Sequence, residues 1–297
     1  MPSPEAMAVG LAGAGPWAAM VHAPVLAAGP ETRLAGVWAR RPEAAAELAG
    51  RHGVPAFTRY EELLDACEAV ACCVAPDAQP DLAVAAARAG KALVLEKPLA
   101  LTLDEARRLV DAVGEAGVRT VVVLTYRFST GVRQFLDEAA ALDAFGGRGC
   151  FLSGAFLGGP FATPWRLEHG ALLDVGPHVV DLMEGALGPV AAVRARGDPQ
   201  GWVGLLLEHQ GGATSDVSLS CRTAIEPSRT EVELYGTSGS RFLDARAATG
   251  PPTFATFRRE VAEAARGASP GPHTPDAARA LHLQEILEEA GRQLRRR

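Results

Sequence analysis

Residues 9–18 read VGLAGAGPWA, a glycine-rich stretch between an apolar run and a helical pattern. Aligned to G-x-G-x-x-G/A, its key positions are Gly13, Gly15 and Ala18. In this pattern the glycines permit a tight turn and let the backbone approach a pyrophosphate, while the small third residue lets helix and strand pack closely. Because N–H groups at the start of a helix bind phosphate, the stretch predicts a dinucleotide-binding turn. The alternative is a glycine-rich turn that only packs.

The first 125 residues alternate short apolar runs with amphipathic helical patterns. The expected strands cover Ala6–Ala12, Leu34–Ala39, Pro55–Phe57, Ala69–Ala75, Ala92–Glu96 and Thr120–Leu124. Helices are expected between them, the first over Pro16–Ala28, and capping boxes of Thr58 with Glu61 and Thr102 with Glu105 predict two helix starts. Apolar strands that alternate with helices predict a parallel sheet covered on both faces.

After Tyr126 the pattern changes to closely spaced strands. Strand candidates lie at Cys150–Phe156, Val190–Ala195, Val203–His209, Thr214–Cys221 and Thr230–Tyr235, and a last helix is expected after Thr274 and Pro275. Alternation of polar and apolar residues in 216–221 indicates an antiparallel sheet with one covered face. Since 297 residues exceed what one hydrophobic core usually organises, we expect two domains, residues 1–125 and 126–297.

Charge and cysteine usage exclude several classes of protein. A net charge of −6 gives no basic field for nucleic acid or an anionic membrane. The apolar N-terminal stretch is too interrupted by glycine and proline for a membrane span. Five cysteines without a C-x-x-C pair suggest neither a disulfide framework nor a zinc site. We therefore expect reduced thiols in a cytoplasmic protein, with no nucleic-acid or membrane partner.

The end of the second expected strand bears on the choice of cofactor. An acidic residue about twenty positions after the glycine motif would bind the ribose 2′-hydroxyl of NAD. Here Ala39 stands in that place, and Arg40 and Arg41 follow. Two arginines can pair with a 2′-phosphate, so we predict a preference for NADP over NAD. The alternative is that both are solvated turn residues.

Residues 94–101 read VLEKPLAL and end the fifth expected strand with an acid, a base and a proline. Ligands bind outside the carboxyl ends of strands in open parallel sheets. Lys97 at such an end could donate a hydrogen bond to a substrate oxygen and favour the charge that develops there during hydride transfer. Glu96 would orient the lysine or approach the nicotinamide ribose, and the Lys97–Pro98 bond could be cis. A structural ion pair of Glu96 and Lys97 is the alternative.

A second candidate site lies in residues 172–182, which read LLDVGPHVVDL. If a helix begins near Asp174, then Asp174, His178 and Asp181 lie on one face, at i, i+4 and i+7. A histidine held by a carboxylate is a general acid/base near neutral pH, whereas the alternative is a surface pair or helix cap. A metal site would need a third ligand beside His169, and nothing else converges, so we expect none.

Taken together, the glycine turn, GKALVLEKPLALTLDEA (residues 90–106) and GALLDVGPHVVDL (residues 170–182) resemble the glucose–fructose oxidoreductase/inositol dehydrogenase/MocA family over nearly the whole chain. The resemblance implies an α/β fold: an N-terminal Rossmann domain with a doubly wound parallel sheet, and a C-terminal α+β domain with a largely antiparallel open sheet. That sheet is expected to bind substrate on one face and to form a homo-oligomer through the other. Gln79 is a departure, because relatives often carry histidine there.

The resemblance also assigns roles by position. Lys97 matches the lysine of the Glu-Lys-Pro motif, and Asp174 and His178 match the pair that assists proton transfer. Positions that line the substrate cleft in relatives match Tyr126, Arg127, Trp165 and Arg166, although Arg127 could be a hinge salt-bridge partner and Trp165 a packing residue. The expected cofactor contacts are Gly13, Gly15, Pro16, Trp17, Ala39, Arg40, Arg41, Pro76 and Glu96.

These observations predict an NAD(P)-dependent oxidoreductase that interconverts a secondary alcohol and a ketone on a sugar, cyclitol or related polyol. In this mechanism Lys97 from the first half and the Asp174–His178 pair from the second must reach the same substrate beside the nicotinamide. The alternative is a non-catalytic relative that binds cofactor or sugar and regulates a partner protein. Its mark would be loss of the lysine or the histidine, and both are present.

Overall fold

The computed structural model describes residues 5–295, which form two compact units. The first comprises the described residues up to Val123 together with Phe254–Leu281, and the second comprises Leu124–Thr253 together with those from His282. The predicted division at residue 125 assigns Phe254–Leu281 to the second domain, whereas the structure groups this segment with the first unit. The assignment of cofactor binding to residues 1–125, and of substrate binding and oligomerisation to residues 126–297, stays a prediction.

The first unit contains a six-stranded parallel sheet in the order β3-β2-β1-β4-β5-β6. Its strands are β1 (Met7–Ala12), β2 (Thr32–Trp38), β3 (Ala56–Phe57), β4 (Ala69–Cys72), β5 (Ala92–Leu95) and β6 (Thr120–Val122). All six residues of β1 are buried, as expected of a central strand with both faces covered. The strand order reverses between β1 and β4, and ligands bind outside the carboxyl ends of the strands at such a point. The predicted doubly wound sheet is confirmed.

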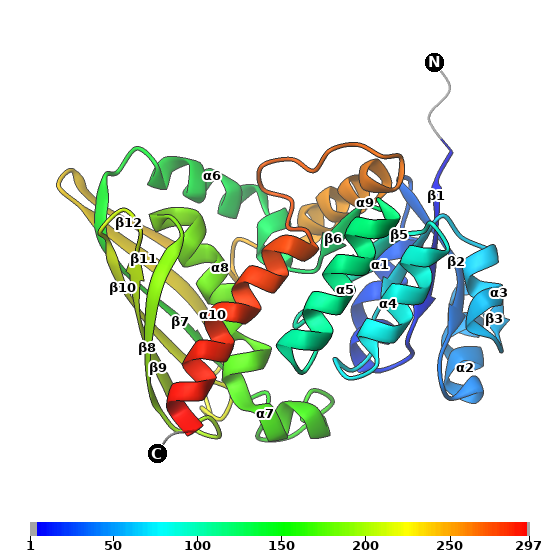
Figure 1. Cartoon of the computed structure of the whole chain (residues 1–297), viewed down its shortest axis with the longest axis horizontal. Coiled ribbons are helices and arrows are strands. Elements are labelled where there is room, and N and C mark those ends of the chain that lie inside the picture. Colours follow the sequence, from blue (N-terminus) through cyan, green and yellow to red (C-terminus); the bar gives the residue numbers. More distant parts are fainter. Residues whose placement is uncertain (1–4, 296–297) are drawn as a thin grey trace. The chain divides into compact units, whose positions relative to one another are not determined.

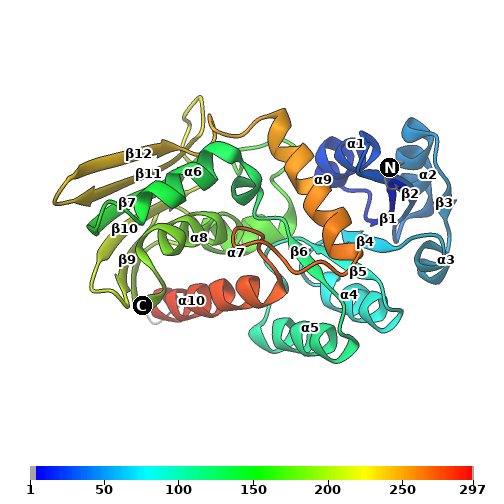
Figure 2. The ribbon, with the colours of Figure 1, turned by 90° about the horizontal axis from the view of Figure 1, so that it is seen from above.

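The helices of the first unit cover both faces of this sheet. They are η1 (Ala18–His22), α1 (Ala23–Ala27), α2 (Pro42–His52), α3 (Tyr60–Asp65), α4 (Gln79–Arg88), α5 (Leu103–Ala116) and most of α9 (Pro251–Ala265). In Figures 1 and 2, α4 and α5 lie side by side on one face, and α1 and α9 lie on the other.

The first predicted helix, Pro16–Ala28, is continuous from Pro16 to Ala27 but is not purely α-helical. Within it, η1 is a π-helical turn in which the N–H of Ala23 donates to the carbonyl of Ala18. Pro24 has no N–H to donate into a regular α-helix, and the regular helix α1 includes this proline in its first turn. The predicted start at Pro16 is confirmed, and the helix ends at Ala27, one residue before the predicted end.

The helix start that one predicted capping box places at Thr102 is confirmed. The hydroxyl of Thr102 accepts a hydrogen bond from the N–H of Glu105 (3.3 Å) at the start of α5. The other was placed one residue too early, because α3 begins at Tyr60 and the carboxylate of Glu62, not Glu61, accepts from the N–H of Arg59 (3.3 Å). The single-residue shift reflects two adjacent glutamates, which the pattern alone does not distinguish.

The segment Phe254–Leu281 is joined to the first unit by specific contacts. The N–H of Val122 in β6 donates to the carbonyl of Pro275 (2.8 Å), and the hydroxyl of Thr120 accepts from the N–H of Ala277 (2.9 Å). Arg258 in α9 pairs with Glu31 before β2 (2.9 Å). This segment returns to β6 late in the chain, which no local sequence pattern indicates.

The second unit contains a six-stranded mixed sheet in the order β12-β11-β7-β10-β9-β8. Only the pair β7–β10 is parallel, and the other four pairs are antiparallel. Its strands are β7 (Ala144–Leu152), β8 (Val190–Gly197), β9 (Val203–His209), β10 (Thr214–Ser220), β11 (Arg229–Gly236) and β12 (Gly239–Asp244). The prediction of a largely antiparallel open sheet is confirmed, although β7 starts six residues earlier than expected.

Helices cover one face of the second sheet. Those of this unit are η2 (Thr125–Phe128), α6 (Thr130–Ala139), α7 (Pro164–Asp174), α8 (Gly176–Leu187) and the larger part of α10 (Ala277–Arg295). In Figure 1, α6, α8 and α10 lie on the same side of the sheet, and the opposite face carries no helix of the described second unit. The last helix starts later than Thr274 and Pro275 predict, because Asp276 accepts from the N–H of Arg279 (2.8 Å) and caps it. None of the helices within residues 5–295 is long and apolar enough to cross a bilayer.

Candidate active site

The glycine turn follows β1 and fits close approach by a ligand. Gly13 has a φ of +128°, and a Cβ there would lie 2.0 Å from the carbonyl oxygen of Cys73, so only glycine is accommodated. Its N–H donates to the carbonyl of Trp38 (2.7 Å), which ties the turn to the end of β2. Around a Cβ at Gly15 there is open space to 4 Å. The turn therefore holds its backbone tightly on the protein side and leaves room on the other, as a pyrophosphate requires.

The arginines predicted to read the cofactor follow β2. Arg41 precedes the first residue of α2, Pro42, and both Arg40 and Arg41 are exposed. Among residues 5–295, neither guanidinium has an ion-pair partner, whereas Arg51 in the same helix pairs with Glu47. Ala39 lies between them and Trp38, whose ring packs at 5.1 Å against the ring of Tyr60.

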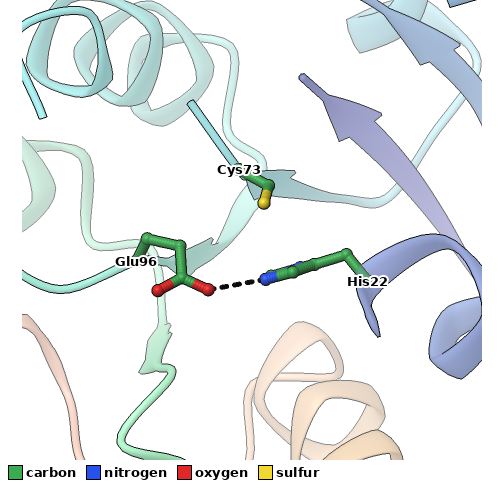
Figure 3. Close-up of side chains that lie close together, drawn as sticks. All are labelled: His22, Cys73 and Glu96. Atoms are coloured by element: carbon green, nitrogen blue, oxygen red, sulfur yellow. Dashed lines mark hydrogen bonds and ion pairs between the residues drawn. The ribbon is translucent and has the colours of Figure 1, made fainter. Parts of the chain in front are cut away.

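The side chain of Glu96 faces the first helix of the unit. One carboxylate oxygen, Oε1, accepts from the indole Nε1 of Trp17 (2.8 Å) and contacts Nε2 of His22 (2.7 Å). Cys73 lies beside the imidazole, as Figure 3 shows. His22 and Cys73 were not among the predicted site residues. They lie outside the glycine motif and the Glu-Lys-Pro motif, and only the fold brings them to Glu96.

His22 is buried among groups that shift the pKa of its imidazole. Its side chain is 2% exposed. Burial by itself lowers the pKa of the imidazole, but the interactions with Cys73 and Glu96 outweigh burial and raise the pKa to about 10. His22, Cys73 and Glu96 thus form one cluster of interacting side chains at the carboxyl end of this sheet.

Gln79, the first residue of α4, holds the backbone that carries Lys97. Its amide nitrogen donates to the carbonyls of Glu96 (2.8 Å), Pro98 (3.2 Å) and Leu99 (3.0 Å). Its amide oxygen accepts from the N–H of Glu96 (2.8 Å). The side chain is 1% exposed, so water cannot replace these bonds. The cis Lys97–Pro98 bond that the sequence suggested is present, and Lys97 itself is half-buried.

In the second unit, Asp174 and His178 lie on two helices rather than one. Helix α7 ends at Asp174 and α8 begins at Gly176, with Val175 between them, so the helix predicted to begin near Asp174 starts two residues later and does not include Asp174. Pro177 lies in the first turn of α8, where proline is tolerated. It lacks the N–H that would continue α7, which accounts for the break. Only His178 and Asp181 share a helix.

Asp174 forms an ion pair with Arg166 (3.2 Å), eight residues earlier in α7. The guanidinium of Arg166 also lies 4.7 Å from the ring of Trp165. Between them, Gly170 has a φ of +74°, and a Cβ there would lie 2.0 Å from the carbonyl oxygen of Pro199. This glycine bends α7, which allows residues eight apart to pair. Arg166 and Asp174 were predicted for substrate binding and catalysis separately, and their pairing was not foreseen.

His178 lies among aromatic side chains. The ring of Tyr126 meets it edge-on at 5.3 Å, and the ring of Phe151 lies 6.4 Å away in a stacked orientation. The hydroxyl of Tyr126 bonds that of Thr230 (3.0 Å), and burial raises the pKa of the Tyr126 phenol. Phe151 was missed by the sequence reasoning, since an aromatic residue in a strand usually indicates core packing.

Arg127 is tied to Asp181 within the second unit. Its Nε donates to a carboxylate oxygen of Asp181 at 2.7 Å, and Asp181 is 1% exposed. This pairing corresponds to the salt-bridge alternative for Arg127. It also explains why Asp181 is buried in α8.

Comparison with known proteins gives matches over most of the chain. A family model described as an oxidoreductase family with an NAD-binding Rossmann fold matches residues 7–124, and one described as a GFO/IDH/MocA C-terminal domain matches residues 148–241. The chain is 30% identical over 165 residues to the levoglucosan dehydrogenase of Pseudarthrobacter phenanthrenivorans, a match covering 52% of this chain and 42% of that protein. It is 32% identical over 162 residues to the D-apiose dehydrogenase of Rhizobium rhizogenes, covering 50% and 46%. Both matches span less than half of the relative's own length.

Solved structures match almost end to end. GenD2 from gentamicin A biosynthesis, in complex with NAD, has a TM-score of 0.83 at 26% identity, with 98% of this chain and 94% of that chain covered. UDP-N-acetylglucosamine 3-dehydrogenase GnnA from Acidithiobacillus ferrooxidans has a TM-score of 0.84 at 19% identity, covering 97% and 98%, and so shares the fold. Since the two family models together match more than half of its residues, the chain belongs to the Gfo/Idh/MocA oxidoreductase family, and its first unit is an NAD-binding Rossmann fold.

Proposed function

We propose that the protein is an NAD(P)-dependent oxidoreductase that interconverts a secondary alcohol and a ketone on a sugar, cyclitol or related polyol. The observation that carries the proposal is the carboxyl edge of the first sheet. There Gly13 forms the tight turn after β1, Gly15 leaves space for a pyrophosphate, and Lys97 follows β5 on a backbone that Gln79 fixes. The dehydrogenases among the relatives support the substrate class.

In this proposal the cofactor transfers the hydride, and two protein side chains act on the reacting oxygen and its proton. The bound nicotinamide supplies hydride acceptance or donation at C4. The Lys97 ammonium donates a hydrogen bond to the reacting oxygen and stabilises the alkoxide-like charge on it. The His178 imidazole takes the hydroxyl proton during oxidation and returns it during reduction. Asp174, 7% exposed and paired with Arg166, is the carboxylate proposed to favour the protonated imidazole.

Residues near these groups are proposed to shape the substrate site of the second unit. Tyr126 and Phe151 pack against the His178 ring, and Arg166, whose guanidinium lies over the Trp165 ring, pairs with Asp174. We assign Arg127 a supporting role, because its guanidinium pairs with buried Asp181.

The proposed cofactor preference is NADP. Exposed Arg40 and Arg41 follow β2, where an NAD-specific site would carry an acid. Together they can supply charge-assisted hydrogen bonds to a 2′-phosphate without first giving up another partner.

We further propose a cytoplasmic homo-oligomer formed through the open face of the second sheet. Leu206, Tyr235 and Phe242 alternate with buried neighbours on their strands and are 37%, 37% and 60% exposed. None of the five cysteines forms a disulfide, which supports a reducing compartment.

Replacing Lys97 tests the proposed activity. On the polyol or keto-sugar that gives the largest NAD(P)H absorbance change in a substrate panel, Lys97→Ala is expected to lower kcat by about 100-fold or more. The Kd for NADPH should stay within about 3-fold, since the lysine acts on the substrate oxygen. Full activity of Lys97→Ala on every substrate would contradict the mechanism. Cofactor binding without turnover of any substrate by the wild-type protein would favour the non-catalytic alternative.

Replacing both Arg40 and Arg41 by serine tests the cofactor preference. Loss of charge-assisted hydrogen bonds to the 2′-phosphate is expected to raise the Kd for NADPH by about 10-fold or more, with little change for NADH. Fluorescence titration of each cofactor measures both values. Arg33→Ser is the matched control, because Arg33 is an exposed arginine of β2 outside the strand's carboxyl end. Tighter binding of NADH than of NADPH by the wild-type protein would remove the preference.

Gln79→Ala tests the support of the lysine segment. Leaving the buried polar groups of residues 96–99 unpaired is expected to lower the free energy of unfolding by about 2–5 kcal/mol. Turnover should fall more than NADPH affinity, because the Lys97 backbone loses its fixed position. Gln134→Ala is the control, since this glutamine is exposed and its side chain donates to Glu138 on the same helix (2.9 Å). Equal losses of turnover in the two variants would show that Gln79 does not position the lysine.

A further inference from the structure

Three side chains with metal-binding atoms lie together at the carboxyl edge of the first sheet. His22 ends η1, Cys73 follows β4, and Glu96 follows β5. One nitrogen of the imidazole, the sulfur and a carboxylate oxygen all lie within 4.8 Å of one another. The cluster is enclosed, since His22 is 2%, Cys73 8% and the Glu96 side chain 12% exposed.

The orientation of the imidazole distinguishes two kinds of site. In a Cys–His–carboxylate relay, the sulfur and the carboxylate contact opposite ring nitrogens. Here Nε2 faces Glu96 at 2.7 Å, and Figure 3 shows the Cys73 sulfur directed toward the same end of the ring. Nδ1 is buried and has no hydrogen-bond partner among the described residues. The three donor atoms therefore gather at one end of the imidazole, and a cation bound by all three would replace the hydrogen bond between Nε2 and Glu96.

The chemistry of these donors selects a class of ion. Zn²⁺ is bound by thiolate sulfur, imidazole nitrogen and carboxylate oxygen at about 2.0–2.3 Å, usually in four-coordinate sites. Mg²⁺ and Ca²⁺ prefer oxygen ligands, so a sulfur and a nitrogen disfavour them. Three protein ligands leave one position of a tetrahedron for water or another small ligand.

We propose that His22, Cys73 and Glu96 form a binding site for one Zn²⁺ ion in the first unit. The ion is bound by Nε2, by Sγ as a thiolate and by the Glu96 carboxylate, and the protons on nitrogen and sulfur leave to solvent. Trp17, which donates to Oε1 of Glu96, orients the carboxylate from outside. The proposal goes beyond the proposed activity, which uses no metal.

Metal binding to the purified, chelator-treated chain tests the proposal. Equilibrium dialysis is expected to give one Zn²⁺ per chain, and the Cys73→Ala and His22→Ala variants should each bind about 100-fold more weakly or worse. Cys72→Ala and Cys150→Ala are the matched controls and should bind as the wild type does. Thermal unfolding without metal establishes that each variant is folded.

Cobalt substitution in the wild-type chain gives a readout that needs no variant. A Co²⁺ ion in this site should show a sulfur-to-cobalt charge-transfer band and the visible bands of tetrahedral coordination, and excess Zn²⁺ should remove both. The proposal is overturned if the wild type retains no Zn²⁺, if its Co²⁺ spectrum lacks the charge-transfer band, or if Cys73→Ala binds Zn²⁺ unchanged. None of these results bears on the turnover measurements with Lys97→Ala.

Discussion

The amide of Gln79 makes four hydrogen bonds to the backbone of residues 96–99, and the proposed chemistry of the first unit depends on them. A strand that ends in an acid, a base and a proline has no sheet partner for its last backbone groups. Left buried and unpaired, these groups would cost about 1–3 kcal/mol each. One side chain from α4 pairs all four, so the segment can leave the sheet, carry Lys97 and remain ordered.

The same sheet edge gathers groups that are far apart in sequence. Parallel strands place their carboxyl ends on one side, so the turn after β1, Cys73 after β4 and Glu96 after β5 become neighbours. Glu96 connects them, since it accepts from Trp17 beside the turn and contacts His22. The proposed cofactor and cation sites can thus arise at one edge because the fold brings together there the backbone N–H groups of the turn and the side chains of His22, Cys73 and Glu96.

The sequence predicts well what local patterns determine. The glycine turn, the alternation of strands and helices in the first unit and the Thr102 cap depend on neighbouring residues, and all three are found. Prediction from the sequence fails where contacts between residues far apart in the chain determine the structure. The break at Val175, the Arg166–Asp174 pair across Gly170 and the packing of Phe254–Leu281 with the first unit have no short-range signal. Gln79 was noticed as a departure, but its four bonds appear only when α4 lies beside β5.

A double-mutant cycle of Lys97→Ala and His178→Ala most directly tests the central claim that both side chains serve one transition state. If both side chains serve one transition state, kcat/KM of the double variant falls only slightly below that of the less active single variant. Each group needs the other to stabilise the same reacting oxygen and its proton. Losses that multiply, as for two independent sites, would contradict it.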